Sequence, residues 1–423
     1  MKKKTRKLLF FVFFLIFITL APILTLYVQG YRFDFENRKL TQTGGLFIKT
    51  IQPKQADIYL DDKFFQTTDF FFSSALIENL LPKEYNVKVQ KKDYHTWEKN
   101  LEIQEKQVVE ARSIVLIPKD PGFELLATNV DNIWFSKDKK RAVLKEENIN
   151  TWSLKLYNFE KDVKTHLLKE IDIYETGAKL EQLEFKDNNT LLLEIAKNEQ
   201  IIYFELQIDK TPPVLKQVKP PEPVIEDVLV YQENNNQIYY IDDSGHLYKA
   251  NKSLSSQEQL TEKPFEGKKE TLYRLYIFNE FIFLQQDQTI YLLNQEKKEF
   301  EEFSENIISL KASPNLTKMA YFSNSEIRIF FLKARTIQPR FNKATDMFLM
   351  RLSESIKNVF WLNSDYLIID TGNSLTIAEI DNRDKINTYE LASVKNPELF
   401  LDHQTEKLYL LDRGNLFVSE KII

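Results

Sequence analysis

The sequence predicts a mostly β protein with an N-terminal transmembrane helix, a small β-sandwich and a β-propeller of about seven four-stranded blades. An uncharged run of 21 residues, 8–28, follows five cations in residues 1–7 and predicts the helix. Short strands of alternating hydrophobicity predict the sandwich, and a strand that recurs about every 43 residues predicts the propeller. We divide the chain accordingly into a basic cytoplasmic tail (1–7), a transmembrane signal anchor (8–28), a juxtamembrane linker (29–43), the sandwich (44–119) and the propeller-like region (120–423).

The charges beside the apolar run predict its orientation. Cations that flank a membrane helix stay in the cytoplasm, and 21 helical residues cover about 30 Å, the thickness of a hydrocarbon core. The alternative is a cleaved signal peptide, whose apolar run spans about 7–15 residues and ends at a small-x-small site. Here the run is longer and ends in Leu-Thr-Leu-Tyr-Val-Gln. We therefore expect a single-pass protein of the cytoplasmic (inner) membrane, with its C-terminal domains extracytoplasmic.

Composition restricts the partners. The chain has 57 Lys and Arg against 62 Asp and Glu, so residues 8–423 carry a net charge near −10. A negative surface repels polyanions, and nucleic acid is therefore not expected as a partner. The chain has no cysteine, which excludes disulfides, thiol nucleophiles, cysteine metal sites and lipoprotein processing, and favours a bacterial protein. The expected partners are the membrane and an envelope protein or a cell-wall or surface polysaccharide.

Residues 44–119 read as short strands in which apolar and polar side chains alternate. This period of two is typical of sheets that are buried on one face, so we expect two small sheets packed face to face. Asp61-Asp62 separates two of the strands and predicts a tight turn. The expected strands cover residues 46–50, 56–60, 85–89, 97–103 and 108–117.

The same segment resembles a PEGA domain, both in "GGLFIKTIQPKQADIYLDDKFFQTT" and in "IENLLPKEYNVKVQKKDYHTWEKNLEIQ". It departs from the family where Gln55, Lys83 and Asp93 replace glycines, which accept positive φ more easily. The stretch 29–44 is also similar to the juxtamembrane stretch of membrane-anchored bacterial PEGA proteins. The resemblance implies a small β-sandwich of envelope proteins without chemistry of its own. The matching residues are Pro53, Ala56, Tyr59, Leu60, Asp61, Asp62, Leu81, Pro82, Tyr85, Val87, Tyr94 and Trp97.

A short strand recurs seven times in residues 120–423, with Leu or Ile first and an aromatic residue second in six copies. A period of 40–45 residues built of short strands is typical of four-stranded propeller blades. The last copy ends close to the C-terminus, so we expect residues 123–126 to supply its outer strand and close the ring. The copies are 156–159, 202–205, 247–250, 290–293, 329–332, 377–380 and 416–419.

Two alternatives to a single propeller remain open. The period could arise by accident in a pair of β-sandwiches or in a solenoid. The proline-rich segment 211–223 prefers an extended, non-sheet conformation. It could therefore be a long loop between blades or a boundary between two domains.

The sequence predicts no catalytic, cofactor-binding or metal-binding residue, and no cofactor. It contains no phosphate-binding loop, nucleophile elbow, zinc or EF-hand motif. The histidines, at positions 95, 166, 246 and 403, are isolated in sequence. The acidic pairs Asp61-Asp62 and Asp242-Asp243 are interpreted as turn residues, because Asp favours local backbone hydrogen bonds.

The aromatic residues Phe64, Phe65 and 70–72 break the alternation of the first domain. One face of this run has to be exposed or packed against another part. We expect packing against the propeller or the membrane surface, and the alternative is a ligand-facing patch.

The expected function rests on the predicted architecture alone. We expect a membrane-tethered binding or scaffold protein of the cell envelope, not an enzyme, that engages its partner through the propeller and the PEGA-like domain. One alternative is a propeller-type hydrolase acting on cell-wall glycan or peptide. Another is a structural cell-wall or surface-layer contact protein in which the propeller is only a spacer.

Overall fold

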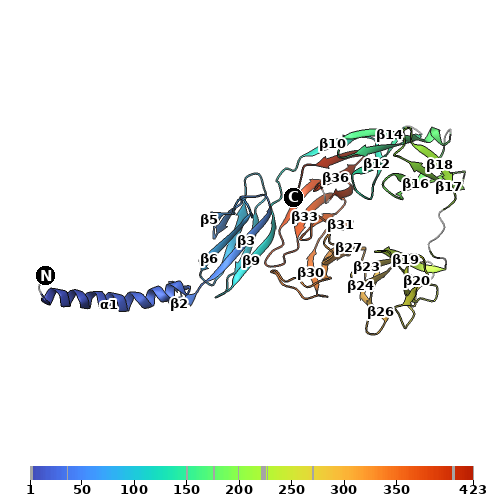
Figure 1. Ribbon diagram of the computed structural model, residues 1–423. Coiled ribbons are helices and arrows are strands. Elements are labelled where there is room, and N and C mark those ends of the chain that lie inside the picture. The colour runs from blue at the N-terminus through green and yellow to red at the C-terminus, as the bar shows by residue number, and fades with distance from the viewer. Residues whose placement is uncertain are drawn as a thin grey trace.

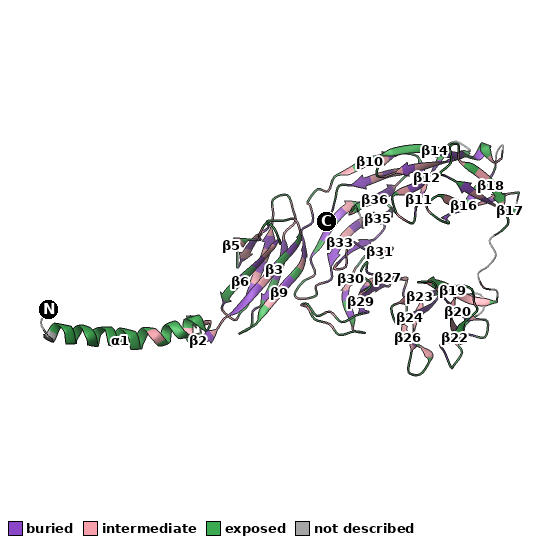
Figure 2. Cartoon of the chain, viewed as in Figure 1, coloured by how far each residue is buried: buried purple, intermediate pink, exposed green. Residues whose placement is uncertain are grey.

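The computed structural model describes residues 3–35, 37–148, 151–174, 177–198, 200–220, 225, 227–268, 271–402 and 405–422. Helix α1 (Lys3–Val28) projects from the rest of the molecule and is exposed along its length (Figures 1 and 2). It is long and apolar enough to cross a membrane. A hairpin of β1 (Tyr31–Asp34) and β2 (Lys39–Gln42) follows it.

The helix is fastened to the domain that follows it. Arg32 Nη1 donates to the carbonyl oxygen of Tyr27 at 2.8 Å, and its Nη2 donates to Asn79 Oδ1 at 2.8 Å. The guanidinium also lies 3.6 Å from the centre of the Tyr27 ring. One cation therefore connects the end of α1 to the β-sandwich.

The β-sandwich consists of a three-stranded sheet, order β6-β3-β9, and a four-stranded sheet, order β5-β4-β7-β8. The inward side chains of both sheets form one apolar core that includes Ile48, Ile58 and Trp97, as expected for sheets that pack face to face. The strands are β3 (Gly44–Gln52), β4 (Asp57–Leu60), β5 (Lys63–Thr67), β6 (Ser74–Leu80), β7 (Glu84–Gln90), β8 (Trp97–Glu102) and β9 (Val108–Val115).

Within the described residues, the rest of the chain forms seven four-stranded antiparallel sheets, which are the blades of a propeller (Figure 1). A 3-10 helix η1 (Glu170–Asp172) follows the first blade.

Blade 1 is β11 (Val130–Phe135), β12 (Arg141–Asn148), β13 (Thr151–Asn158) and β14 (Val163–Lys169). Blade 2 is β15 (Lys179–Phe185), β16 (Thr190–Lys197), β17 (Gln200–Gln207) and β18 (Val214–Val218). Blade 3 is β19 (Val228–Asn234), β20 (Gln237–Asp242), β21 (Leu247–Asn251) and β22 (Gln257–Gln259). Blade 4 is β23 (Tyr273–Phe278), β24 (Phe281–Gln286), β25 (Thr289–Asn294) and β26 (Glu299–Ser304).

Blade 5 is β27 (Ser309–Ala312), β28 (Lys318–Phe322), β29 (Glu326–Phe331) and β30 (Asp346–Arg351). Blade 6 is β31 (Asn358–Trp361), β32 (Tyr366–Asp370), β33 (Ser374–Glu379) and β34 (Thr388–Ser393). Blade 7 is β35 (Glu398–Asp402), β36 (Lys407–Asp412), β37 (Asn415–Ser419) and β10 (Phe123–Ala127).

The predicted fold class, mostly β with a propeller of four-stranded blades, is confirmed. Each copy of the sequence repeat overlaps the third strand of a blade, from β13 in blade 1 to β37 in blade 7. β10 pairs with β37, with Phe123 opposite Ser419. The N-terminal strand of the propeller therefore supplies the outer strand of the last blade, as the sequence predicts.

Neighbouring blades share apolar cores at six of the seven positions around the ring. The exception in the described chain is the boundary between blades 2 and 3, which we call the seam. The core of blades 1 and 2 ends in blade 2, and blade 3 has a separate small cluster on its own side.

The side chains of blade 2 account for the seam. β16 is buried at alternate positions, whereas β28 and β32 are buried throughout. Alternate residues of a strand face opposite sides, so Glu194 points away from the core side of β16. Burying an uncompensated carboxylate against blade 3 would cost several kcal/mol.

The described part of the proline-rich segment 211–223 contains a β-strand. Val214–Val218 is β18, which pairs with β17 as the outer strand of blade 2. Residues 221–224 lie outside the described residues. The expected non-sheet conformation is therefore wrong for the five residues of β18.

Candidate functional site

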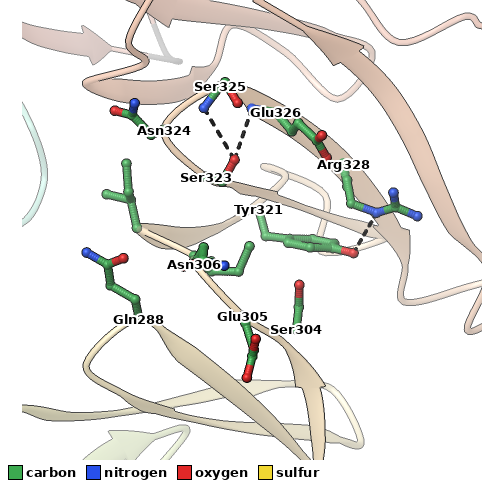
Figure 3. A pocket seen from close by; sticks show the side chains of 12 residues that line it. Gln288, Ser304, Glu305, Asn306, Tyr321, Ser323, Asn324, Ser325, Glu326 and Arg328 are labelled. Carbon is green, nitrogen blue, oxygen red and sulfur yellow. Dashed lines mark hydrogen bonds between the residues drawn. The ribbon is translucent and has the colours of Figure 1, made fainter.

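A polar cavity of about 610 Å³ lies where blades 4 and 5 meet. Its walls are the connection between these blades and the hairpins between the second and third strands of each (Figure 3). These connections leave the blades on one side of the propeller, which we call the distal face. The cavity is lined by Gln288, Ser304, Glu305, Asn306, Ile307, Ile308, Tyr321, Ser323, Asn324, Ser325, Glu326 and Arg328.

Buried hydrogen bonds fix the loops of the cavity. The side-chain amide of Gln285, which is 3% exposed, donates to the carbonyl oxygens of Ile307 at 3.1 Å and Ile308 at 3.3 Å. Ser323 Oγ accepts from the backbone N–H of Ser325 and from that of Glu326 at 3.0 Å (Figure 3). Satisfied backbone groups of this kind hold a tight turn in one conformation.

One wall carries the buried phenol of Tyr321 beside the partly exposed charges of Arg328 and Asp346. Tyr321 Oη donates to Asp346 Oδ1 at 2.7 Å, and Arg328 Nε donates to Tyr321 Oη at 3.0 Å. Arg328 Nη2 also lies 2.6 Å from Asp346 Oδ2. Burial and the hydrogen bond to Asp346 raise the pKa of Tyr321, so its hydroxyl remains a donor at neutral pH.

The two carboxylates of the cavity, Glu326 and Glu305, differ in whether they form an ion pair. Arg351 Nε donates to Glu326 Oε1 at 2.9 Å, which neutralises that carboxylate. Glu305 is exposed and forms no hydrogen bond or ion pair with another described residue. The cavity therefore offers hydroxyls, amides and one carboxylate that can bind a polar ligand.

The β-sandwich is fixed to the opposite, proximal face of the propeller, at blade 6. Lys99 is fully buried, and its Nζ lies 2.8 Å from Glu379 Oε1. The same ammonium donates to the carbonyl oxygens of Asp381, Arg383 and Lys385, all in the loop before β34. A buried cation requires this complete set of acceptors.

In the same buried network, Glu379 accepts from two further side chains and from the backbone N–H of Asn387 at 3.0 Å. Trp97 Nε1 donates to its Oε2 at 2.8 Å, and Asn387 Nδ2 donates to its Oε1 at 2.7 Å. Burial raises the pKa of Glu379, and the charge of Lys99 offsets only part of that rise. The network joins the sandwich and the propeller by hydrogen bonds that water cannot replace.

A second set of contacts fixes the C-terminal end of the sandwich. Glu110 N donates to Gln338 Oε1 at 2.9 Å, and Val115 N donates to Tyr366 Oη at 3.1 Å. Beside these contacts, and within the propeller itself, Asp365 accepts from Arg335 Nη1 at 2.6 Å and from Lys318 Nζ at 3.1 Å. The sandwich thus contacts blades 5 and 6 through two separate groups of residues.

The isolated histidines take local roles where they are described. His95 lies 5.2 Å from the ring of Tyr389, and burial and the charge of Lys119 lower its pKa. His246 approaches Gln259 through Nδ1 at 3.1 Å. His166 lies on the exposed part of β14, and His403 is outside the described residues.

The acidic pairs lie in the turns that the sequence predicts. Asp242 Oδ1 accepts from Ser244 Oγ and from the backbone N–H of His246, both at 2.8 Å. Asp61 accepts from the backbone N–H of Asn86 at 3.0 Å. Among the described residues, no group of three or more His, Cys, Asp or Glu could hold a metal ion.

The sequence did not single out the cavity or the buried network. The polar stretch Ser323-Asn324-Ser325-Glu326 could have indicated the cavity, because it lies between the apolar runs 319–322 and 329–332 of one blade. Lys99 alternates with Trp97 and Leu101, both of which are core residues. An inward-facing lysine in such a pattern indicates a buried partner.

The strand order defines a class of protein: a seven-bladed β-propeller that carries a β-sandwich and an apolar N-terminal helix. No known family matches the sequence, and no curated protein matches it.

Three solved structures illustrate the likeness in fold. YCF48 from Cyanidioschyzon merolae is 9% identical, with 70% of this chain and 98% of that chain covered and a TM-score of 0.43. The Cps50 (Swd1) β-propeller domain of Myceliophteria thermophila is 10% identical, with 71% and 99% covered and a TM-score of 0.40. An oligogalacturonate lyase in complex with manganese is 9% identical, with 71% and 96% covered and a TM-score of 0.41. The fold assignment itself rests on the strand order described above.

Proposed function

We propose that this protein is a binding or scaffold protein of the bacterial cell envelope. Its helix α1 anchors it in the cytoplasmic membrane, and its sandwich and propeller lie outside the cytoplasm. The sandwich acts as a PEGA-type spacer. The distal face of the propeller binds an envelope protein or a surface polymer, and no catalytic step is involved.

The buried network of Lys99, Glu379 and Trp97 supports this proposal most directly. It fixes the sandwich to the proximal face, which leaves the distal face and its cavity on the opposite side. A tether that is fixed at both of its ends is suited to holding a binding surface at a constant distance from a membrane.

The binding role is tested with the full chain in lipid nanodiscs, exposed separately to solubilised envelope proteins and to wall polysaccharide from the source cell. The variant Gln288→Trp fills the cavity from an exposed hairpin. Its matched control is Glu296→Trp, in the same blade but on the proximal side. We expect capture of one ligand that Gln288→Trp abolishes and Glu296→Trp retains.

Two outcomes of that experiment would contradict the proposal. Equal capture by both variants would show that the cavity is not the binding site. Turnover of the polysaccharide by the wild-type chain would favour the hydrolase alternative.

The orientation is tested by labelling, because the chain has no cysteine of its own. A membrane-impermeant maleimide is added to spheroplasts, whose cytoplasmic membrane is intact and accessible. It should label Glu296→Cys and leave Thr5→Cys unlabelled. Labelling of Thr5→Cys alone would reverse the orientation. Loss of residues 3–28 from the mature chain would identify α1 as a cleaved signal.

A further inference from the structure

Five phenylalanines are exposed on one edge of the β-sandwich, which we call the aromatic edge. Their exposed fractions run from 47% to 80%. The expected packing of these residues against the propeller is wrong, because the propeller contacts lie on β8, at the other edge of the same sheet. The aromatic edge consists of Phe64, Phe65, Phe70, Phe71 and Phe72.

Hydrogen bonds within the loop between β5 and β6 fix its conformation, in which the rings of Phe70, Phe71 and Phe72 are exposed. Asp69 Oδ2 accepts from the backbone N–H and from the hydroxyl of Ser74, each at 2.9 Å, and Oδ1 accepts from the backbone N–H of Phe72. These hydrogen bonds lower the pKa of Asp69. Phe70 and Phe71 stack edge to face, with ring centres 5.5 Å apart. The loop is therefore preorganised without an apolar neighbour to cover it.

The membrane does not cover this loop in the proposed orientation. In the β3–β6 ladder, Gly44 pairs with Leu80 near the helix, and Lys49 pairs with Ser74 at the other end. A strand rises about 3.3 Å per residue, so the loop lies about 20 Å from the end of the sandwich that follows the membrane helix.

The backbone of β5, beside the rings, can also form hydrogen bonds with another strand. β5 is the edge strand of the sheet β5-β4-β7-β8 and pairs only with β4 among the described strands. An edge strand presents unpaired N–H and C=O groups that can accept another strand. An exposed edge with consecutive apolar side chains is a template for strand addition.

A second copy of the chain does not fit this edge. Antiparallel pairing of β5 with its own copy requires a two-fold axis perpendicular to the strands. Such an axis reverses the strand direction between the two copies, so the strand ends that follow α1, marked by Gly44 and Leu80, would lie at opposite ends of the pair. Copies that share one membrane have parallel anchors, so this argument rests on the proposed membrane anchoring.

We propose that β5 binds an extended apolar segment of an envelope protein, which adds to the sheet as a fifth strand and covers the aromatic edge. Strand addition derives affinity from main-chain hydrogen bonds and specificity from alternate side chains.

The size and charge of the edge support this occupant. Phenylalanines bury about 150–250 Å² each, so the exposed part of the five rings amounts to roughly 600 Å², close to the ~800 Å² that one side of a specific interface buries. The exposed cations Lys54 and Lys63 flank the rings. They favour a segment that ends in carboxylates.

The test uses the full chain in nanodiscs and a fluorescent probe, the peptide Glu-Val-Thr-Val-Thr-Val-Thr-Val-Glu. The control peptide carries N-methyl groups on alternate residues and cannot complete a strand ladder. Binding is measured by fluorescence anisotropy, and hydrogen exchange reports protection of the β5 amides. We expect binding of the first peptide only, with slower exchange in β5.

Variants separate the two contributions. Phe71→Ser/Phe72→Ser removes rings and should weaken binding at least tenfold, whereas Ile201→Ser, an exposed residue of β17, should leave it unchanged. Gln66→Pro interrupts the edge backbone and should also weaken binding, and its folding is verified by the unfolding midpoint. No binding at millimolar peptide, or equal binding of both peptides, would overturn the proposal.

The result is independent of the distal cavity. Gln288→Trp should bind the peptide as well as the wild type does. Loss of peptide binding in that variant would place the peptide at the cavity and would overturn the assignment to β5.

Discussion

At the scale of single residues, Lys99 shows how a charge can hold two domains together. Its ammonium is fully buried and is surrounded by one carboxylate and three backbone carbonyls of blade 6. Burying Lys99 and Glu379 costs desolvation free energy, and removal of either one leaves the charge of the other buried without a partner.

Lys99→Met should therefore destabilise the protein by about 3–5 kcal/mol. Urea unfolding followed by tryptophan fluorescence measures the change, because Trp97 belongs to the same network. The control is Lys385→Met, whose half-exposed pair with Glu98 should contribute at most about 1 kcal/mol. Equal effects of the two substitutions would contradict the role of the buried pair.

Asp365 leads to a prediction about acid stability. Burial favours its neutral form, but the charges of Lys318 and Arg335 outweigh burial and hold the pKa below its ordinary value of 3.8. A lowered pKa contributes stability above the unfolded-state value, and this contribution is lost as the pH falls through the folded-state value. Wild-type stability should therefore fall steeply below about pH 4.

Asp365→Asn should remove that part of the pH dependence. At pH 7 it should cost about 2–3 kcal/mol, because Lys318 and Arg335 lose their shared carboxylate. Denaturant unfolding at pH 3, 4 and 7 measures both effects. An unchanged slope below pH 4 would show that other carboxylates dominate acid unfolding.

Residues also show what the sequence could not specify. Gln55 and Asp93 stand where the PEGA resemblance has glycine, and both have positive φ, at 57° and 67°. Alternation predicted five strands of this domain but missed β5 and β6, and it could not predict the contact of Trp97 with Glu379. These two residues lie 282 positions apart in the chain, and no local pattern connects them.

At the scale of elements, the pairing of β10 with β37 closes the ring. The prediction of β10 succeeded because one repeat lacked an outer strand and one apolar strand was left over at the start. β18 was more difficult to predict, because Pro212 and Pro213 precede it directly. Pairing with β17 outweighs the local preference of the prolines for an irregular segment.

Val418→Pro tests the closure, because Val418 lies between Glu124 of β10 and Tyr409 of β36. Proline removes a ladder hydrogen bond, and we expect a loss of about 3 kcal/mol or more. The control Val218→Pro is at the end of an outermost strand, where proline is better tolerated. Thermal unfolding should show the larger shift for Val418→Pro, and the reverse order would contradict closure by β10.

At the scale of the whole molecule, the seam sets this propeller apart from a uniform ring. The repeat period predicted the number of blades, but it carries no information on whether each pair of neighbours packs together. That outcome depends on side chains such as Glu194, which lies on the face of β16 outside the core shared by blades 1 and 2.

Spin-label distances test the seam directly. Nitroxides at Val214→Cys and Glu258→Cys mark the outermost strands of blades 2 and 3. Nitroxides at Glu301→Cys and Phe348→Cys mark the same strands of blades 4 and 5, which share a core. We expect a longer mean distance across the seam than in the control pair. Equal distances would show a closed ring in solution.

The parallel pairing of β3 with β9 has a mechanical consequence. β3 follows α1 and the β1–β2 hairpin, β9 leads into the propeller, and the two strands run side by side in the same direction. A force that pulls the propeller away from α1 therefore slides one strand along the other. All hydrogen bonds between β3 and β9 share that load at once instead of opening one at a time. The sandwich therefore resists a force that pulls α1 and the propeller apart.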